Sequence, residues 1–299
     1  MMSNRPIRRI ALVAPAGPIE AHLVTGAVEV LRLWGYEPVV GKHCLDNTPH
    51  YGIINHSATL EDRWADLRWA FEADDIDAAM CARGGFGTIH LLDRLTPQFL
   101  QAHPKWLIGF SDITAVHGAL HHAGLKSIHG PMAKFLTEQG PDSPGSKALH
   151  DILQGNAMHY RLPSHALNRT GQATATLLGG NLAMLNALLA TPYNLIEPGC
   201  ILFVEDIAEQ VYQVQRMLYT LRHAGLLEQL AGLIVGQFTN YRENADGNAM
   251  YTMISDMVAP YSFPVAFDFP VGHNHRNLPL IEGAKATFAV TENDIYLDF

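Results

Sequence analysis

The sequence has few charged residues, few cysteines and no long apolar run. Charged side chains make up 16% of its 299 residues and sum to a formal net charge of -9 at pH 7, so no basic stripe suited to nucleic acid is expected. The three cysteines, Cys44, Cys81 and Cys200, are odd in number and far apart, which fits neither a disulfide framework nor a paired-cysteine zinc site. We therefore expect a reducing, cytoplasmic compartment, no metal, no cofactor, and a small molecule or peptide as the partner.

The apolar runs are also too short for a membrane protein. None approaches the roughly 18 residues that a membrane-spanning helix needs, so no membrane insertion is expected. Arg8 and Arg9 precede the apolar stretch 10–14, as basic residues precede the core of a secretory signal. However, Pro15 and Pro18 interrupt this stretch before any cleavage-like site, which is untypical of a signal peptide. We interpret it as the first buried strand.

The first half of the chain predicts an α/β domain. Hydrophobic residues make up 48% of the sequence, enough for a sizeable core, and this length favours two domains over one. Up to about residue 130, short apolar runs alternate with segments of helical period, which is typical of a parallel sheet with crossover helices. We expect strands at 10–14, 37–40, 78–82 and 105–110, and helices at 20–34, 59–73, 88–94 and 112–122.

The second half predicts a mixed α and β domain. Residues 140–170 are rich in proline and serine and poor in periodic signal, with one helix expected at 146–153. Further helices are expected at 181–189 and 211–224, and strands at 201–204, 233–237, 265–269 and 285–290. The resulting domain prediction is a Rossmann-like α/β domain at 1–155, a linker at 156–170 and a mixed domain at 171–299.

Ser111 has the sharpest local pattern. A predicted strand runs through Gly109 into Ser111 and then directly into an amphipathic helix. Such a turn lifts a hydroxyl out of the sheet edge and puts it at a helix N-terminus, where backbone N–H groups favour a developing negative charge. This suits a nucleophile. Serine is also a preferred N-cap residue, so an ordinary helix cap is the alternative.

A glycine-rich turn, Arg-Gly-Gly-Phe-Gly at 83–87, follows another predicted strand and precedes a helix. Adjacent glycines let the backbone approach a ligand closely and present N–H groups to a phosphate or an oxyanion. The spacing matches neither the dinucleotide fingerprint nor the P-loop. A tight turn without a ligand is the alternative.

An acid stands at the end of the predicted strand 201–204. A carboxylate held by a rigid strand is suited to orient a histidine, and Glu205 has this position. Helix capping is the alternative for this acid. Asp206 and Glu209 compete with Glu205 for the functional role.

The polar loop 270–279 contains His273 and His275. Histidine is the usual general base because its ordinary pKa lies near operating pH. The chain has 16 histidines, so most of them are expected to be structural. The pairs His273/His275 and His121/His122 have no third ligand at a spacing typical of a metal site.

In this order, the segments resemble the LD-carboxypeptidase family, which comprises muramoyl-tetrapeptide carboxypeptidases and their microcin-immunity relatives. The likeness covers nearly the whole chain. It rests on Ala-Leu-Val-Ala-Pro-Ala-Gly at 11–17, Ala-Arg-Gly-Gly-Phe-Gly at 82–87, Gly-Phe-Ser-Asp at 109–112, Gly-Pro-Met at 130–132, Leu-Gly-Gly-Asn-Leu at 178–182, Val-Glu-Asp-Ile at 204–207, Val-Gln-Arg-Met-Leu at 214–218 and Gly-His at 272–273.

The resemblance implies a role for each of these motifs. Ser111 would be the nucleophile, His273 the base and Glu205 the group that orients the histidine. Backbone N–H groups of Gly85 and Asp112 would hold the oxyanion.

The resemblance further implies substrate contacts at Arg83, Gly84, Phe86 and Asn181. Phe86 stands where the family often has tyrosine. The family's Leu-Pro-x-Gly segment occurs here as residues 278–283, two residues longer, which leaves the register after His273 open.

The implied function is removal of the terminal D-alanine from murein tetrapeptides during cell-wall recycling, by a cytoplasmic homodimer. An alternative with the same chemistry is a self-immunity hydrolase for an aminoacyl-nucleotide antibiotic. That enzyme needs an aromatic platform for a nucleobase, which no loop of the sequence clearly offers. An alternative of another class is a non-catalytic anion or nucleotide binder that uses residues 83–87.

Overall fold

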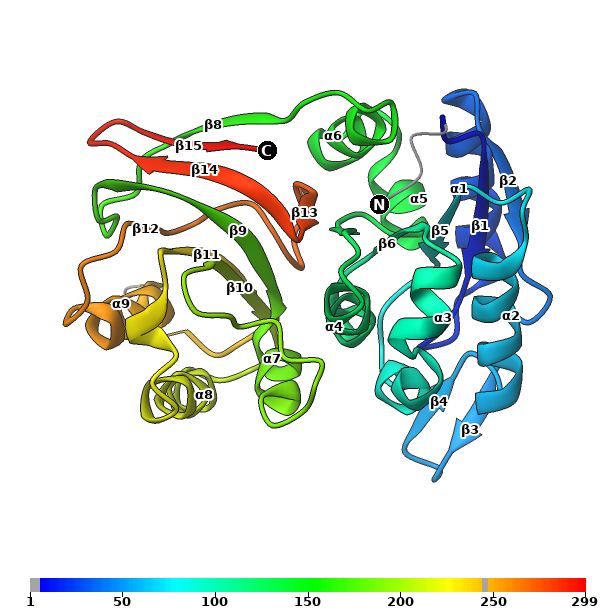
Figure 1. Cartoon of the computed structure of the whole chain (residues 1–299), viewed down its shortest axis with the longest axis horizontal. Coiled ribbons are helices and arrows are strands. Elements are labelled where there is room, and N and C mark those ends of the chain that lie inside the picture. Colours follow the sequence, from blue (N-terminus) through cyan, green and yellow to red (C-terminus); the bar gives the residue numbers. More distant parts are fainter. Residues whose placement is uncertain (1–5, 244–246) are drawn as a thin grey trace. The chain divides into compact units, whose positions relative to one another are not determined.

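The computed structural model describes residues 6–243 and 247–299. The chain divides into two compact units, each with its own sheet (Figure 1). Unit 1 comprises the residues up to 156 together with 275–280, and unit 2 comprises 157–274 and 281–299. Strand β13 (Leu280–Glu282) crosses the boundary that follows residue 280.

Unit 1 contains a parallel sheet in the order β7-β6-β5-β1-β2. Helices α1 and α5 pack together, α2 packs against β1 and β5, and α4 packs against β7. The N-terminal parallel-sheet domain expected from the sequence is confirmed. Its strands are β1 (Arg9–Val13), β2 (Glu37–Val40), β5 (Ala78–Cys81), β6 (Trp106–Gly109) and β7 (Ser127–His129), and its helices are α1 (Ala21–Leu33), α2 (Leu60–Glu72), α3 (Pro97–Ala102), α4 (Thr114–His122), α5 (Ala133–Gln139) and α6 (Pro144–Leu153).

Local chemistry explains where these helices begin. The hydroxyls of Thr59, Thr96 and Ser143 accept backbone N–H groups at the starts of α2, α3 and α6, as N-caps do. A proline follows the cap in α3 and α6, where its missing N–H costs nothing. All four residues of β5 are buried, as in the centre of a covered parallel sheet.

Two features of unit 1 differ from the sequence prediction. Residues 88–94 form a 3-10 helix, η1 (Thr88–Arg94), where we expect an α-helix. A short hairpin of β3 (Thr48–His50) and β4 (Ile54–His56) was not predicted. Its strands have three residues each, too few to show an alternating pattern.

Unit 2 contains a mixed sheet in the order β12-β11-β10-β9-β14-β15-β8. The pairs from β12 to β9 are parallel, and those from β9 to β8 are antiparallel. The mixed second domain is therefore confirmed. Its strands are β8 (His159–Pro163), β9 (Gly171–Asn181), β10 (Ile201–Ile207), β11 (Gly232–Thr239), β12 (Val265–Ala266), β14 (Ala284–Val290) and β15 (Asp294–Asp298), and its helices are α7 (Leu182–Leu188), α8 (Val211–His223) and α9 (Ala249–Val258).

The long strand β9 was missed from the sequence because Gly179 and Gly180 weaken the strand pattern. A Cβ at Gly179 would overlap the carbonyl oxygen of Phe203 in the neighbouring strand β10, so close packing of the two strands requires the glycine. Strand β8 lies within residues 156–170 and pairs with β15. No helix in the described ranges is long and apolar enough to cross a membrane.

Candidate active site

Ser111 occupies a strained turn between β6 and α4. It is the first residue of a short 3-10 turn, η2 (Ser111–Ile113), and its φ of 67° lies in the left-handed region that non-glycine residues seldom enter. The N-cap positions of η2 and α4 belong to Phe110 and Ile113. Ser111 is thus not an ordinary N-cap. Strain of this kind costs about 1–3 kcal/mol and gathers at active sites, and a serine on a sharp strand-to-helix turn has the form of a nucleophile elbow.

The glycine-rich turn of unit 1 lies directly against this serine. Because β5 and β6 are parallel neighbours, the turns at their carboxyl ends meet at one sheet edge. A Cβ on Gly84 would lie 2.9 Å from Cβ and 3.1 Å from Oγ of Ser111. A Cβ on Gly85 would lie 2.9 Å from the Cα and N atoms of Gly17. The absent side chains therefore allow the turn to pack against both the serine and the loop after β1.

Asp112 and Thr88 join the two turns. The carboxylate of Asp112 accepts the backbone N–H of Thr88 at 2.9 Å, and the Thr88 hydroxyl donates to the backbone oxygen of Asp112 at 2.6 Å. Asp112 is buried, and burial raises the pKa of its carboxyl above the ordinary value. The pair fixes the glycine turn relative to the residue that follows Ser111.

Arg63 of α2 also holds the glycine turn, and the sequence analysis missed it. Its Nη1 donates to the backbone oxygens of Pro15 at 2.7 Å and Gly87 at 2.9 Å. The residue is only 2% exposed. A signal existed, because Arg63 shares a helical stripe with the buried residues Leu67 and Ala70, and a charged residue on such a stripe indicates a buried structural role.

Phe86 lies in a cluster of rings formed with His50, His56 and His90. Its ring centroid is 6.0, 5.7 and 5.3 Å from those of the three histidines. Phe86 itself is 36% exposed. Burial, followed by the charge of Arg63, lowers the pKa of His56 to about 4, so this ring stays neutral near pH 7. The sequence offered no aromatic platform, but the hairpin β3–β4 and η1 bring these rings together.

In unit 2, His273 forms a hydrogen bond with Glu205. Their Nδ1 and Oε2 atoms are 2.7 Å apart, the Glu205 side chain is fully buried, and that of His273 is 17% exposed. An ionised carboxylate only accepts hydrogen bonds, so Nδ1 carries the proton and Nε2 is the basic nitrogen of the neutral ring. Of the two histidines in this loop, His275 is solvent-exposed, and His273 is the one that the buried acid orients.

Two features of the backbone near Glu205 allow its contact with His273. The β10–β11 pairing has a register shift between Val204 and Asp206, and bulges of this kind re-aim side chains near active sites. Gly272 has a φ of 107°, and a Cβ there would lie 2.6 Å from both Cβ and Oε2 of Glu205. The glycine before His273 is therefore required for the backbone to pass the acid.

Asp206 has a structural role that separates it from Glu205. Its carboxylate accepts from Asn181 Nδ2 at 2.8 Å and from the N–H of Ala183, in the first turn of α7, at 2.9 Å. Burial, followed by the charge of Glu205, raises the pKa of Asp206 to about 6. Of the two adjacent acids, Asp206 thus stabilises a helix start and Glu205 contacts the histidine.

Asn181 stands opposite Glu205 in the pairing of β9 with β10. Its Oδ1 caps α7 by accepting from Met184 N at 3.1 Å, while its Nδ2 contacts Asp206. Both ends of the amide therefore hold the frame around Glu205. The substrate contact expected at Asn181 remains a prediction.

His117 connects the nucleophile strand to α4 and β7. Its Nε2 lies 2.9 Å from the carbonyl oxygen of Gly109 and its Nδ1 lies 2.7 Å from the hydroxyl of Ser127. Because the carbonyl only accepts, Nε2 carries the proton and Ser127 donates to Nδ1. Burial lowers the pKa of His117 to about 4, which keeps this arrangement intact near neutral pH.

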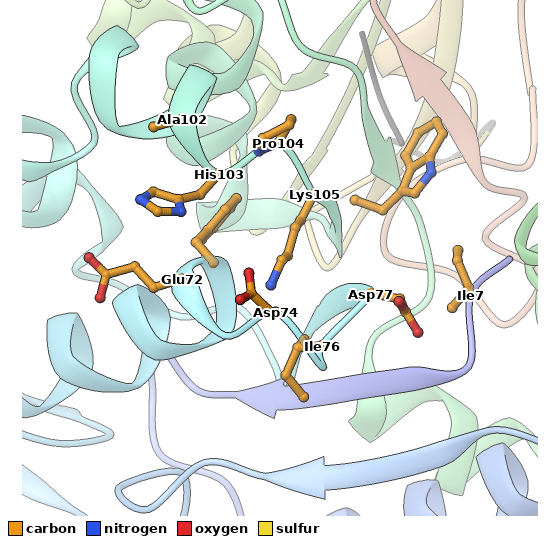
Figure 2. Close-up of a pocket in the computed structure, with 11 residues that line it drawn as sticks. Ile7, Glu72, Asp74, Ile76, Asp77, Ala102, His103, Pro104 and Lys105 are labelled. Atoms are coloured by element: carbon orange, nitrogen blue, oxygen red, sulfur yellow. The ribbon is translucent and has the colours of Figure 1, made fainter. Parts of the chain in front are cut away.

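A hollow at the opposite edge of the unit 1 sheet has no place in this site. It has a volume of ≈ 210 Å³ and lies where β6 begins, at Trp106 (Figure 2). Lys105 donates there to the last carbonyls of α2, those of Ala70 and Ala73, and Asp77 accepts the backbone N–H groups of Arg8 and Arg9. These contacts have a structural role, because they join separate segments of the chain. Ser111 follows the carboxyl end of β6, whereas this hollow lies at its amino end.

The expected site residues thus form one group in each unit. Unit 1 holds Arg83, Gly84, Gly85, Phe86, Ser111 and Asp112, and unit 2 holds Asn181, Glu205 and His273. Within residues 6–243 and 247–299, no group of three or more histidine, cysteine or acidic side chains is arranged to hold a metal ion.

Sequence comparison finds related proteins over almost the full chain. The LD-carboxypeptidase N-terminal domain matches residues 10–130 and the LD-carboxypeptidase C-terminal domain matches residues 174–288. A murein tetrapeptide carboxypeptidase of Pseudomonas aeruginosa is 31% identical over 280 residues, which cover 90% of this chain and 89% of the relative.

Solved structures that share the fold include the following two. A muramoyltetrapeptide carboxypeptidase from Oxalobacter formigenes is 29% identical and superposes with a TM-score of 0.86 over 97% of this chain and 98% of the other. MccF, solved in complex with glutamyl sulfamoyl guanosine, is 22% identical and superposes with a TM-score of 0.86 over 99% of this chain and 97% of its own.

Proposed function

The chain belongs to the LD-carboxypeptidase family and is a carboxypeptidase, and from this premise we propose that it releases the terminal D-alanine of murein tetrapeptides by serine catalysis. The observation that carries the proposal is the hydrogen bond between His273 and the buried Glu205, because a histidine oriented in this way is the base that a serine nucleophile requires. Family membership removes the non-catalytic anion binder as an alternative.

In the proposed mechanism, Nε2 of His273 takes the proton of the Ser111 hydroxyl. Ser111 Oγ attacks the carbonyl carbon of the L-centre of the diamino acid, and Glu205 stabilises the imidazolium that forms. The same histidine then protonates the leaving amine of D-alanine. Water, activated by His273, hydrolyses the acyl-enzyme and restores Ser111.

The oxyanion of the tetrahedral intermediate is proposed to accept the backbone N–H groups of Gly85 and Asp112. The proposal is supported by the bond between Asp112 and Thr88, which holds the two turns together before substrate arrives. Preorganised donors of this kind lower the barrier by ~3 kcal/mol each in serine peptidases.

The substrate and setting follow from the relatives. The P. aeruginosa relative is named a murein tetrapeptide carboxypeptidase, which supports a murein tetrapeptide as the substrate and cell-wall recycling as the setting. We further propose a cytoplasmic location, since Cys44, Cys81 and Cys200 are buried and free, and a homodimer, on the family resemblance.

The direct test is to incubate the purified enzyme with a disaccharide-tetrapeptide and follow D-alanine release by mass spectrometry. Ser111→Ala is expected to lower the rate by several orders of magnitude, with Ser146→Ala in α6 as a control of unchanged rate. Equal rates for wild type and Ser111→Ala would remove Ser111 as the nucleophile.

A second candidate substrate is an aminoacyl-nucleotide conjugate. It is favoured by the ring cluster around Phe86, since this ring of the glycine turn is 36% exposed and offers a face on which a base can stack. It is also favoured by MccF, which was solved in complex with glutamyl sulfamoyl guanosine. Comparing kcat/KM for an aminoacyl-sulfamoyl adenosine with that for the tetrapeptide separates the two candidates.

A further inference from the structure

Unit 1 contains a hollow beside the glycine turn to which no role has been given. Its volume is ≈ 610 Å³, within the range of small-molecule sites. It opens between the start of α1 and α5, at the edge of the sheet where ligands of open α/β folds bind. Its lining includes Pro18, Ile19, Leu23, Leu45, Arg83 and Lys134.

Arg83 is the cation of this hollow that no acid neutralises. Its Nη1 donates to the backbone oxygen of Pro18 at 3.1 Å, and within the part of the chain that the structure describes it has no carboxylate partner. Its side chain is half-buried, so an incoming anion meets less water than at the surface. A guanidinium binds a carboxylate through two parallel hydrogen bonds.

The other charges of the hollow are partly matched among themselves. Lys134 of α5 lies 3.7 Å from Glu138, and Glu20 lies 3.2 Å from His22. Pairs as exposed as these contribute little. Lys134 can therefore leave Glu138 for an incoming anion, while Arg83 supplies the fixed donor.

Arg83 is also close to the reacting groups of unit 1. It directly precedes Gly84, which lies against Ser111, and a Cβ on Gly17 would lie 3.5 Å from both Arg83 Nε and Gly85 Cα. The Arg83 side chain thus passes Gly17 beside the turn that is proposed to bind the oxyanion. In a carboxypeptidase substrate, the terminal carboxylate is separated from the scissile nitrogen by a single carbon. The residue that binds this carboxylate must therefore lie close to the nucleophile and the oxyanion site.

We propose that Arg83, assisted by Lys134, binds the terminal carboxylate of the D-amino acid that leaves, and so restricts the enzyme to the ends of peptides. This inference rests on the proposed function, which it deepens. Arg83 is the residue that separates a chain end from an internal bond, because an internal peptide carbonyl offers no negative charge to a desolvated guanidinium.

The test compares a tetrapeptide ending in D-alanine with the same peptide ending in D-alaninamide, for wild type, Arg83→Met, Arg83→Lys and Lys134→Met. Wild type is expected to prefer the acid. Arg83→Met is expected to lower kcat/KM for the acid by about 10- to 100-fold, the effect of losing a charge-assisted contact, and to change that for the amide by less than about 3-fold. Arg83→Lys should keep part of the preference, and Lys134→Met should lower it less than Arg83→Met.

The controls separate the two proposals. Arg68→Met in α2, outside the hollow, should keep the wild-type preference, and retained cleavage of the amide by Arg83→Met shows that the variant is folded. Cleavage of neither peptide by wild type contradicts the proposed function. Equal cleavage of acid and amide by wild type, or an equal loss on both in Arg83→Met, overturns the inference alone.

Discussion

A Cβ atom on Gly272 would lie 2.6 Å from both Cβ and Oε2 of Glu205. Gly84 stands in the same relation to Ser111, where the added Cβ would lie 2.9 Å from the serine Cβ. Ser111 and Glu205 thus each have a glycine packed against them from another segment of the same unit. The two glycines determine how closely the Gly-His loop and the glycine-rich turn approach the residues that they serve.

Gly272→Ala is expected to abolish most activity. The new methyl group overlaps the Glu205 side chain and must displace His273 from it. The backbone at residue 272 has a φ of 107°, where an alanine is strained. A misplacement of about 1 Å in a reacting group costs roughly 100-fold, so kcat for tetrapeptide cleavage should fall at least that far. The matched control is Gly199→Ala, which has a φ of 78° with nothing within 4 Å of the added Cβ; it should lower Tm slightly and leave kcat unchanged. Normal kcat in Gly272→Ala would contradict the account.

Glu205→Gln is expected to lower kcat by about 10³- to 10⁴-fold while KM changes little. The amide keeps the shape of the acid but neither stabilises the imidazolium nor holds the proton on Nδ1, and the corresponding change in serine proteases has an effect of this size. Steady-state kinetics on the tetrapeptide measures it.

The neighbouring acid provides the contrast to Glu205. Asp206→Asn alters the cap of α7 and should lower the free energy of unfolding by about 1–2 kcal/mol, with kcat reduced far less than by Glu205→Gln. Similar losses of kcat in the two variants would show that the catalytic role of Glu205 is assigned wrongly.

Much of the unit 1 sheet followed from the sequence because its strands are short, apolar and separated by amphipathic helices. The site motifs were also legible, since Ser111 and Glu205 each follow a predicted apolar strand. In the structure Glu205 lies inside β10, which continues to Ile207. The left-handed φ of Ser111 could not be predicted, because nothing in a single sequence distinguishes a helix cap from a strained turn. The structure resolves that choice through the N-cap positions held by Phe110 and Ile113.

The residues that the sequence analysis missed act through distant contacts. Thr88 bonds Asp112 across two turns, Arg63 joins Pro15 to Gly87, and His117 joins Gly109 to Ser127. Such pairs depend on which strands are neighbours. Periodicity predicts that a segment is a strand or helix, but the partner of a polar side chain follows only from the strand order.

His117 makes the stability of unit 1 sensitive to acid. Its pKa is about 4 when folded, against 6.5 ordinarily, so the unfolded chain binds the proton more tightly. The contribution is fully present above pH 6.5 and is lost as pH falls toward 4, by up to about 3 kcal/mol. Urea unfolding at pH 7.5 and pH 4.5 measures the difference. His117→Gln should show a smaller decrease between the two pH values than wild type, whereas His22→Gln, an exposed control, should show the wild-type decrease.

The central claim, that Ser111 carries the acyl group, is tested most directly by rapid acid quench of the enzyme with tetrapeptide, followed by mass spectrometry of its proteolytic fragments. The account predicts that the fragment containing Ser111 gains the mass of the peptide acyl group without D-alanine, and that Glu205→Gln forms this adduct more slowly. An adduct on any other residue, or D-alanine release by Ser111→Ala at the wild-type rate, would contradict it.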